Sequence, residues 1–204
     1  MKKILFSALM LAASSHVFAA ITPSLVSITS NGSGGYTWTY SVALAQDQNA
    51  VGRAAAPGAA TAAGLNVTST TSDYFTIYDF AGYIPGSAVA PNSDWVFQTL
   101  NVGSTPGDVL PTDNAGIPNL TWYLANNVTY PGPQSLGTFS ADSIYSLPTP
   151  VSYTGQGTRN FGTAAGTEIS NVGTVGAPSG VPEPGTYALL GTGLVAFGFI
   201  RRRA

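Results

Sequence analysis

Alternation of large apolar and small polar residues is the clearest local pattern in this chain. Between residues 35 and 44 the large side chains occupy every second position, as Tyr36, Trp38, Tyr40 and Val42, with Thr37, Thr39, Ser41 and Ala43 between them. A period of two residues places successive side chains on opposite faces of an extended strand. The pattern predicts a half-buried antiparallel strand, with Trp38 on its inward face beside Tyr36 and Tyr40.

Shorter runs of β-branched and aromatic residues follow at 25–29, 65–68, 74–80, 94–102, 120–124, 128–130, 135–139, 143–147 and 151–154. Turn residues separate them, including Asn31-Gly32, Pro85-Gly86, Pro131-Gly132-Pro133 and Gly155-Gln156-Gly157. No long stretch between the two ends of the chain shows a helical period. The sequence therefore predicts an all-β fold, an antiparallel sandwich of which a Greek-key or jelly-roll path is one form, with a barrel as the alternative.

Three stretches interrupt the strand pattern. Residues 50–64 are rich in alanine and glycine and are predicted to form a loop, with a short helix as the alternative. Residues 103–119 combine three prolines with Asp108, Asp113 and Asn114, and loops of this length are often functional or mobile. Residues 162–180 lose aromatic side chains and gain Gly, Ser, Thr and Ala, which predicts a stalk. The expected all-β exported domain is thus 20–161, followed by a stalk over 162–180.

The N-terminus has the order of a secretory signal. Lys2 and Lys3 precede an apolar run over residues 4–13, and the small residues of Val17-Phe18-Ala19 follow. We predict a signal peptide over residues 1–19, cut between Ala19 and Ala20. The apolar run is too short to span a membrane, and a lipoprotein is excluded because the chain has no cysteine.

The C-terminus combines Val181-Pro182-Glu183-Pro184-Gly185, an apolar run over 187–200 and the basic residues Arg201, Arg202 and Arg203. A helix over about 184–200 would be roughly 25 Å long, a little short of a hydrocarbon core of about 30 Å. Long arginine side chains can reach the interface and act as a cytoplasmic stop. We predict one transmembrane helix over about 184–200, with the preceding residues outside.

This three-part order resembles the PEP-CTERM sorting signal of Gram-negative bacteria, and the resemblance is confined to residues 181–204. It implies that an exosortase, a membrane protease, recognises the tail, cuts near Pro182-Glu183-Pro184 and sends the protein to the exterior. It further implies transient anchoring in the inner membrane with the body in the periplasm, then a location at the cell surface or outside the cell. Proteins with this tail have different activities, ice binding among them. An ordinary anchor that is never cut is the alternative.

Removal of both ends changes the charge of the protein. Residues 20–180 keep two arginines against eight carboxylates, which gives a formal charge of −6. Such a body repels nucleic acid and anionic lipid. Direct binding to an anionic polysaccharide would need bridging cations.

The exported part has little catalytic chemistry, because the only histidine is His16 and there is no cysteine. This excludes catalytic triads and the usual zinc, copper and haem ligands, so we expect no enzyme and no cofactor. Carboxylates remain: Asp73, Asp79 and Asp94 lie near aromatic residues in the sequence, and a glycan hydrolase would need two acids facing each other. Candidates for calcium ligands, which are oxygen atoms of Asp, Asn and carbonyl groups, are Asp108 with Asp113 and Asn114, and Asn92 with Asp94.

The sequence thus favours a non-enzymatic exported surface or extracellular-matrix protein, associated with exopolysaccharide or biofilm. Its expected partners are an exosortase-type membrane protease, the inner membrane through the C-terminal helix, and exopolysaccharide or other matrix components, with no nucleic acid. Two alternatives remain open. One is a carbohydrate-binding or ice-binding β-sandwich module, and the other is a carboxylate-dependent glycan hydrolase.

Overall fold

The computed structural model of the protein describes residues 20–53, 56 and 71–180. In these ranges the chain forms ten strands and no helix: β1 Ile21–Ser30, β2 Tyr36–Leu44, β3 Gln48–Val51, β4 Tyr74–Ile77, β5 Trp95–Leu100, β6 Asn119–Leu124, β7 Thr129–Pro131, β8 Gln134–Ser143, β9 Pro148–Arg159 and β10 Glu168–Pro178. Accordingly, this part of the chain offers no helix long and apolar enough to cross a membrane. The predicted signal peptide, the strand at 65–68 and the helix over about 184–200 lie outside the described residues.

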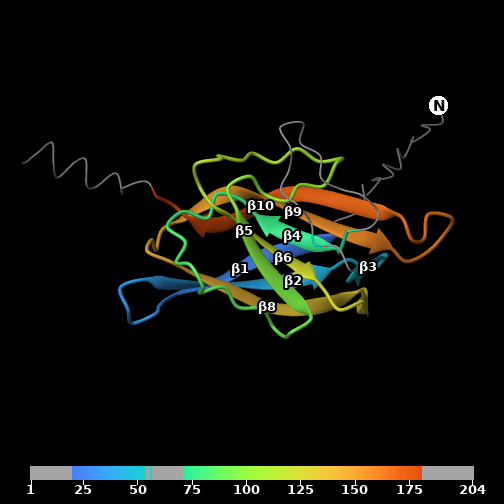
Figure 1. Ribbon diagram of the computed structural model, residues 1–204, viewed down its shortest axis with the longest axis horizontal. Coiled ribbons are helices and arrows are strands. Elements are labelled where there is room, and N and C mark those ends of the chain that lie inside the picture. The colour runs from blue at the N-terminus through green and yellow to red at the C-terminus, as the bar shows by residue number, and fades with distance from the viewer. Residues whose placement is uncertain (1–19, 54–55, 57–70, 181–204) are drawn as a thin grey trace, which may run out of the picture.

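The strands form two sheets, and all of their pairings are antiparallel (Figure 1). The smaller sheet has the order β1-β2-β8. The larger one has the order β5-β6-β4-β9-β3-β7, with β10 on the other edge of β9. Strands β4 and β3 follow one another along a single edge of β9, where they pair with residues 153–156 and 158–159. The predicted all-β, antiparallel architecture is confirmed.

Aromatic side chains from the two sheets meet in one core. Phe139 of β8 lies 5.0 Å from Phe75, 5.2 Å from Trp95 and 5.8 Å from Trp122, measured between ring centroids. Its ring meets theirs edge to face, while Phe75 and Trp122 stack at 5.3 Å. Edge-to-face and offset-stacked pairs add about 0.5–1.5 kcal/mol each to the gain from burial. This cluster joins the smaller sheet to the larger one.

The strand with the clearest alternation forms as predicted. It runs over Tyr36–Leu44, with Trp38 and Tyr40 fully buried and Tyr36 partly buried. The polar atoms of the two buried rings are satisfied, because Trp38 Nε1 donates to the Tyr145 carbonyl at 3.0 Å and Tyr40 Oη donates to the Gly176 carbonyl at 3.0 Å. Trp38 is therefore core and offers no exposed platform for a sugar ring.

Two glycine-rich stretches differ from expectation. Gly155-Gln156-Gly157, expected as a turn, lies within β9, and residues 168–178, expected in a stalk, form β10 along the length of β9. Glycines occur inside these strands because neighbouring elements pack closely against them. A Cβ at Gly173 would lie 2.6 Å from Tyr153 Cε1, and one at Gly176 would lie 2.8 Å from Leu25 Cδ2. Here glycine marks close contact between elements.

The long loop over 103–119 is a packing element. Its first residues, Gly103 to Pro106, are buried against the face of β4 that points away from the smaller sheet. The carbonyl of Ser104 accepts hydrogen bonds from Thr76 Oγ1 and from Tyr78 Oη, both at 2.9 Å. Strand β4 is consequently buried on both faces, apolar on one side and hydroxyl-rich on the other.

Candidate functional site

The described body ends where the predicted sorting signal begins. After β10 ends at Pro178, the Ser179 amide donates to the Leu147 carbonyl at 2.9 Å. A Cβ at Gly180 would lie 3.5 Å from Tyr145 Cε2 and 3.6 Å from Ala81 Cβ. The chain is thus held to the body up to its last described residue. The sorting residues Val181, Pro182, Glu183, Pro184 and Gly185 and the basic residues Arg201, Arg202 and Arg203 lie outside the described residues.

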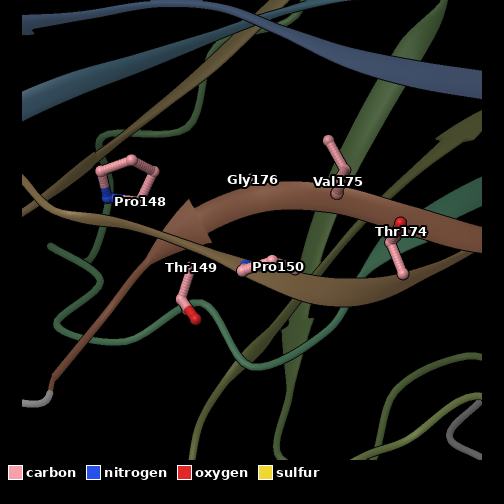
Figure 2. A pocket seen from close by; sticks show the side chains of 6 residues that line it. All are labelled: Pro148, Thr149, Pro150, Thr174, Val175 and Gly176. Atoms are coloured by element: carbon pink, nitrogen blue, oxygen red, sulfur yellow. The ribbon is translucent and has the colours of Figure 1, made fainter.

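The surface around this exit is apolar. Ile144, Tyr145 and Leu147 expose 55%, 36% and 37% of their surface in the connection from β8 to β9. An open groove of about 400 Å³ lies beside them, lined by Pro148, Thr149, Pro150, Thr174, Val175 and Gly176 of the adjacent strands β9 and β10 (Figure 2). Its lining has no titratable group. The side chains that line the groove can offer apolar contact and two threonine hydroxyls, and none of them is an acid or base for catalysis.

An ion pair between a buried aspartate and a partly buried arginine ties β3, β4 and β9 together. Asp73, directly before β4, is fully buried, and its Oδ1 lies 3.2 Å from Arg53 Nη1. Its Oδ2 accepts hydrogen bonds from the Val51 amide at 2.9 Å and from Thr158 Oγ1 at 2.8 Å. Arg53 also donates to the Thr71 carbonyl at 2.7 Å and to Thr158 Oγ1 at 2.9 Å. The alternation of residues gave no signal for this pair.

The surroundings of Asp73 define what it can do. Burial raises the pKa of the Asp73 carboxyl, and the Arg53 guanidinium and three hydrogen bonds oppose part of that rise. Both carboxylate oxygens already accept protein donors, and the side chain has no exposed surface. Asp73 is therefore suited to holding strands together and has no lone pair directed at a substrate.

The other two sequence-predicted acids have different partners. Asp79 Oδ1 accepts from the Asn114 amide at 2.9 Å, and burial raises the pKa of this carboxyl. Asp94 Oδ2 accepts from Tyr130 Oη at 2.7 Å. Asp73, Asp79 and Asp94 thus each belong to a separate set of hydrogen bonds. Asp73 precedes β4 and Asp79 follows it, so these two acids flank one strand.

In the first candidate calcium cluster, Asp113 and Asn114 lie in a hydrogen-bonded part of the long loop. Asn119 Nδ2 donates to Asp113 Oδ1 at 2.9 Å, and Asn114 Oδ1 accepts from the Gly116 amide at 3.0 Å. Asp108 is exposed on the same loop. Across the described ranges no three His, Cys, Asp or Glu side chains gather as they would to hold a metal ion. Calcium binding at Asp108, Asp113 and Asn114 stays a prediction.

The predicted signal cleavage site is described on one side only. Ala19 lies outside the described residues, and Ala20 directly precedes β1 with no exposed surface. The Ala20 amide donates to Asn171 Oδ1 at 3.0 Å. Asn171 belongs to β10, so the expected stalk gave no reason to connect the two residues.

Comparison with known proteins assigns one segment of the chain. No curated protein and no solved structure matches the chain. Residues 180–203 match the family model of the PEP-CTERM protein-sorting motif, as the order of Pro182-Glu183-Pro184, apolar run and arginines predicts. The match starts at the residue where the described body ends. The C-terminal segment of this chain carries the PEP-CTERM protein-sorting motif, which implies an exported protein that an exosortase processes.

Proposed function

We propose that this chain is a non-enzymatic surface or extracellular-matrix protein with an antiparallel β-sandwich body, released by an exosortase-type membrane protease. In this proposal the signal peptide over 1–19 directs export. The helix over about 184–200 then anchors the body on the periplasmic side of the inner membrane. Cleavage near Pro182-Glu183-Pro184 sends the body to the cell surface or beyond, where it joins exopolysaccharide or other matrix components.

The observation that carries this proposal is the sorting motif placed directly after a folded body. The motif match begins at residue 180, and β10 together with the Ser179–Leu147 hydrogen bond holds the chain to the body up to that point. A protease that cuts a few residues later would leave every strand of the body in the released product. The contacts of Phe139 with Phe75, Trp95 and Trp122 support a sandwich.

The chemistry of the body supports a structural role. Residues 20–204 contain neither histidine nor cysteine, and Asp73, Asp79 and Asp94 are each engaged by different partners. A formal charge of −6 on residues 20–180 makes neutral glycans, or anionic glycans bridged by cations, the suitable matrix partners.

Mass spectrometry of the surface form tests the proposal. In a host with the sorting protease, we expect the recovered protein to begin at Ala20 and to lack the residues beyond the Pro182-Glu183-Pro184 motif. Replacing these three residues by alanine should leave the chain in the membrane at its full length after signal removal. If wild-type surface protein keeps an intact C-terminal Arg-Arg-Arg-Ala, the tail is a permanent anchor and the proposal is wrong.

A further inference from the structure

Two backbone amides at the start of the body converge on one side-chain oxygen. The Ala20 and Ile21 amides donate to Asn171 Oδ1 at 3.0 and 3.2 Å. Ala20 has no exposed surface, and Asn171 exposes 6% of its own. Hydrogen bonds across 151 and 150 residues of sequence connect the two ends of the body here. The first residue after the predicted signal cleavage is therefore an internal part of the fold.

The glycines of β9 make room for this arrangement. A Cβ at Gly155 would collide with the Ile21 carbonyl and would lie 2.7 Å from Asn171 Oδ1. Asn171 stands opposite Gly155 in the β9–β10 register, and its Nδ2 donates to Tyr153 Oη at 3.3 Å. That bond orients the amide so that Oδ1 faces β1. The carbonyl of Ala20 is also bonded to the body, because it accepts a hydrogen bond from the Ala45 amide at 3.2 Å.

A second buried acceptor near Ala20 lacks a partner. Gln48 of β3 has no exposed surface, and neither its Oε1 nor its Nε2 is hydrogen-bonded. A Cβ at Gly157 would lie 3.3 Å from Ala20 Cβ and 3.5 Å from Gln48 Oε1, so both residues approach the same side of this glycine. Leaving a buried polar group unpaired is unfavourable and uncommon, so such a group calls for an explanation.

We propose that Asn171 and Gln48 form a binding site for the α-ammonium group of Ala20, the group that signal cleavage creates. Hydrolysis of the Ala19–Ala20 amide adds one water: its oxygen completes the Ala19 carboxylate, and its two hydrogens go to the Ala20 nitrogen. The nitrogen then carries three N–H donors instead of one. One keeps the bond to Asn171 Oδ1, and a second reaches Gln48 Oε1.

The charge explains why the site prefers the processed terminus. An α-amino group in water has an ordinary pKa of about 7.7–8.0, and burial lowers the pKa of such an amine unless hydrogen-bond acceptors hold its charged form. Hydrogen bonds from a charged donor are roughly twice as strong as neutral ones, and a buried charge needs such partners. The inference rests on the export route of the proposed function, since it requires cleavage after Ala19.

The sequence offers a clean test, because residues 20–204 contain no lysine and the α-amino group is the only primary amine of the processed protein. We would label the protein recovered from the host with an amine-reactive acetyl ester and follow the mass increase with time. The control is the same chain carrying an added Gly-Ser before Ala20, whose amine lies beyond the site. We expect the native amine to react at least about tenfold more slowly than the control, as for a group exposed only by local opening.

Two further measurements keep the inference falsifiable. Protein acetylated in denaturant and refolded should melt a few degrees lower than the unmodified protein, and Asn171→Leu should remove most of this difference. If Asn171→Leu does not fold, Asn171→Asp, which adds a negative charge at the same size, should instead widen it. Equal labelling rates in the native and extended chains, or equal melting temperatures with and without the acetyl group, would overturn the site. Neither result bears on C-terminal processing, which the mass of the surface form tests separately.

Discussion

At the scale of single residues, the body depends on polar groups that the sequence pattern does not reveal. From the sequence alone, Asp73 resembles a turn residue before a strand, and Arg53 is one of two isolated cations in residues 20–180. The structure brings them together 3.2 Å apart, with Asp73 fully buried. Such a pair is weak evidence for net stability, but removal of Asp73 leaves the partly buried Arg53 guanidinium and the Val51 amide without their acceptor.

Replacing Asp73 by alanine should therefore destabilise the body by about 3–5 kcal/mol. The change leaves the Arg53 guanidinium without its counter-ion and the Val51 amide without its acceptor. Denaturant unfolding followed by tryptophan fluorescence measures the free energy directly. Asp108→Ala is the matched control, because Asp108 is exposed and its loss should change stability by less than about 0.5 kcal/mol. Equal effects of the two substitutions would show that the buried pair contributes little.

At the scale of elements, alternation predicts strands well where one face packs against the core and the other meets solvent. Residues 36–44 follow this rule, and their strand and its buried Trp38 form as predicted. The rule finds only residues 151–154 of β9 and misses β10, because glycines there allow neighbouring backbones to approach closely. Local sequence cannot distinguish a glycine required by a turn from one required by a crossing strand. It equally missed the Ala20–Asn171 contact, which joins residues 151 positions apart.

Gly155→Ala tests this interpretation of the glycines. A methyl group at position 155 would meet the Ile21 carbonyl, so β1 must move away from β9. Overpacking of this kind typically costs about 1–3 kcal/mol. Gly180→Ala provides the control, since a Cβ there would make only ordinary contacts, the nearest at 3.5 Å. Melting temperatures of the two variants decide the question: equal melting temperatures would contradict the close approach of β1 to Gly155.

At the scale of the whole molecule, the body reaches to the edge of the sorting signal. The expected stalk over 162–180 would have left a flexible spacer between the body and the membrane. In the structure β10 fills most of that stretch, and Val175 and Ala177 belong to the hydrophobic core. Export and sorting must therefore handle a domain whose last strand ends two residues before the motif match begins.

Two truncations separate a strand from a stalk. A chain that ends at Gly180 keeps all ten described strands and should melt cooperatively at the temperature of the released surface form. A chain that ends at Thr167 loses β10, and with it the backbone partners of β9 over residues 148–158, the core side chains Val175 and Ala177, and the Asn171 acceptor for Ala20. Because these losses affect both the sheet edge and the anchoring of β1, we expect the shorter chain to lose its cooperative thermal transition, as followed by circular dichroism.

A true stalk would be dispensable for folding. If the chain that ends at Thr167 melts cooperatively at an unchanged temperature, that result would contradict the assignment of β10 to the core of the body.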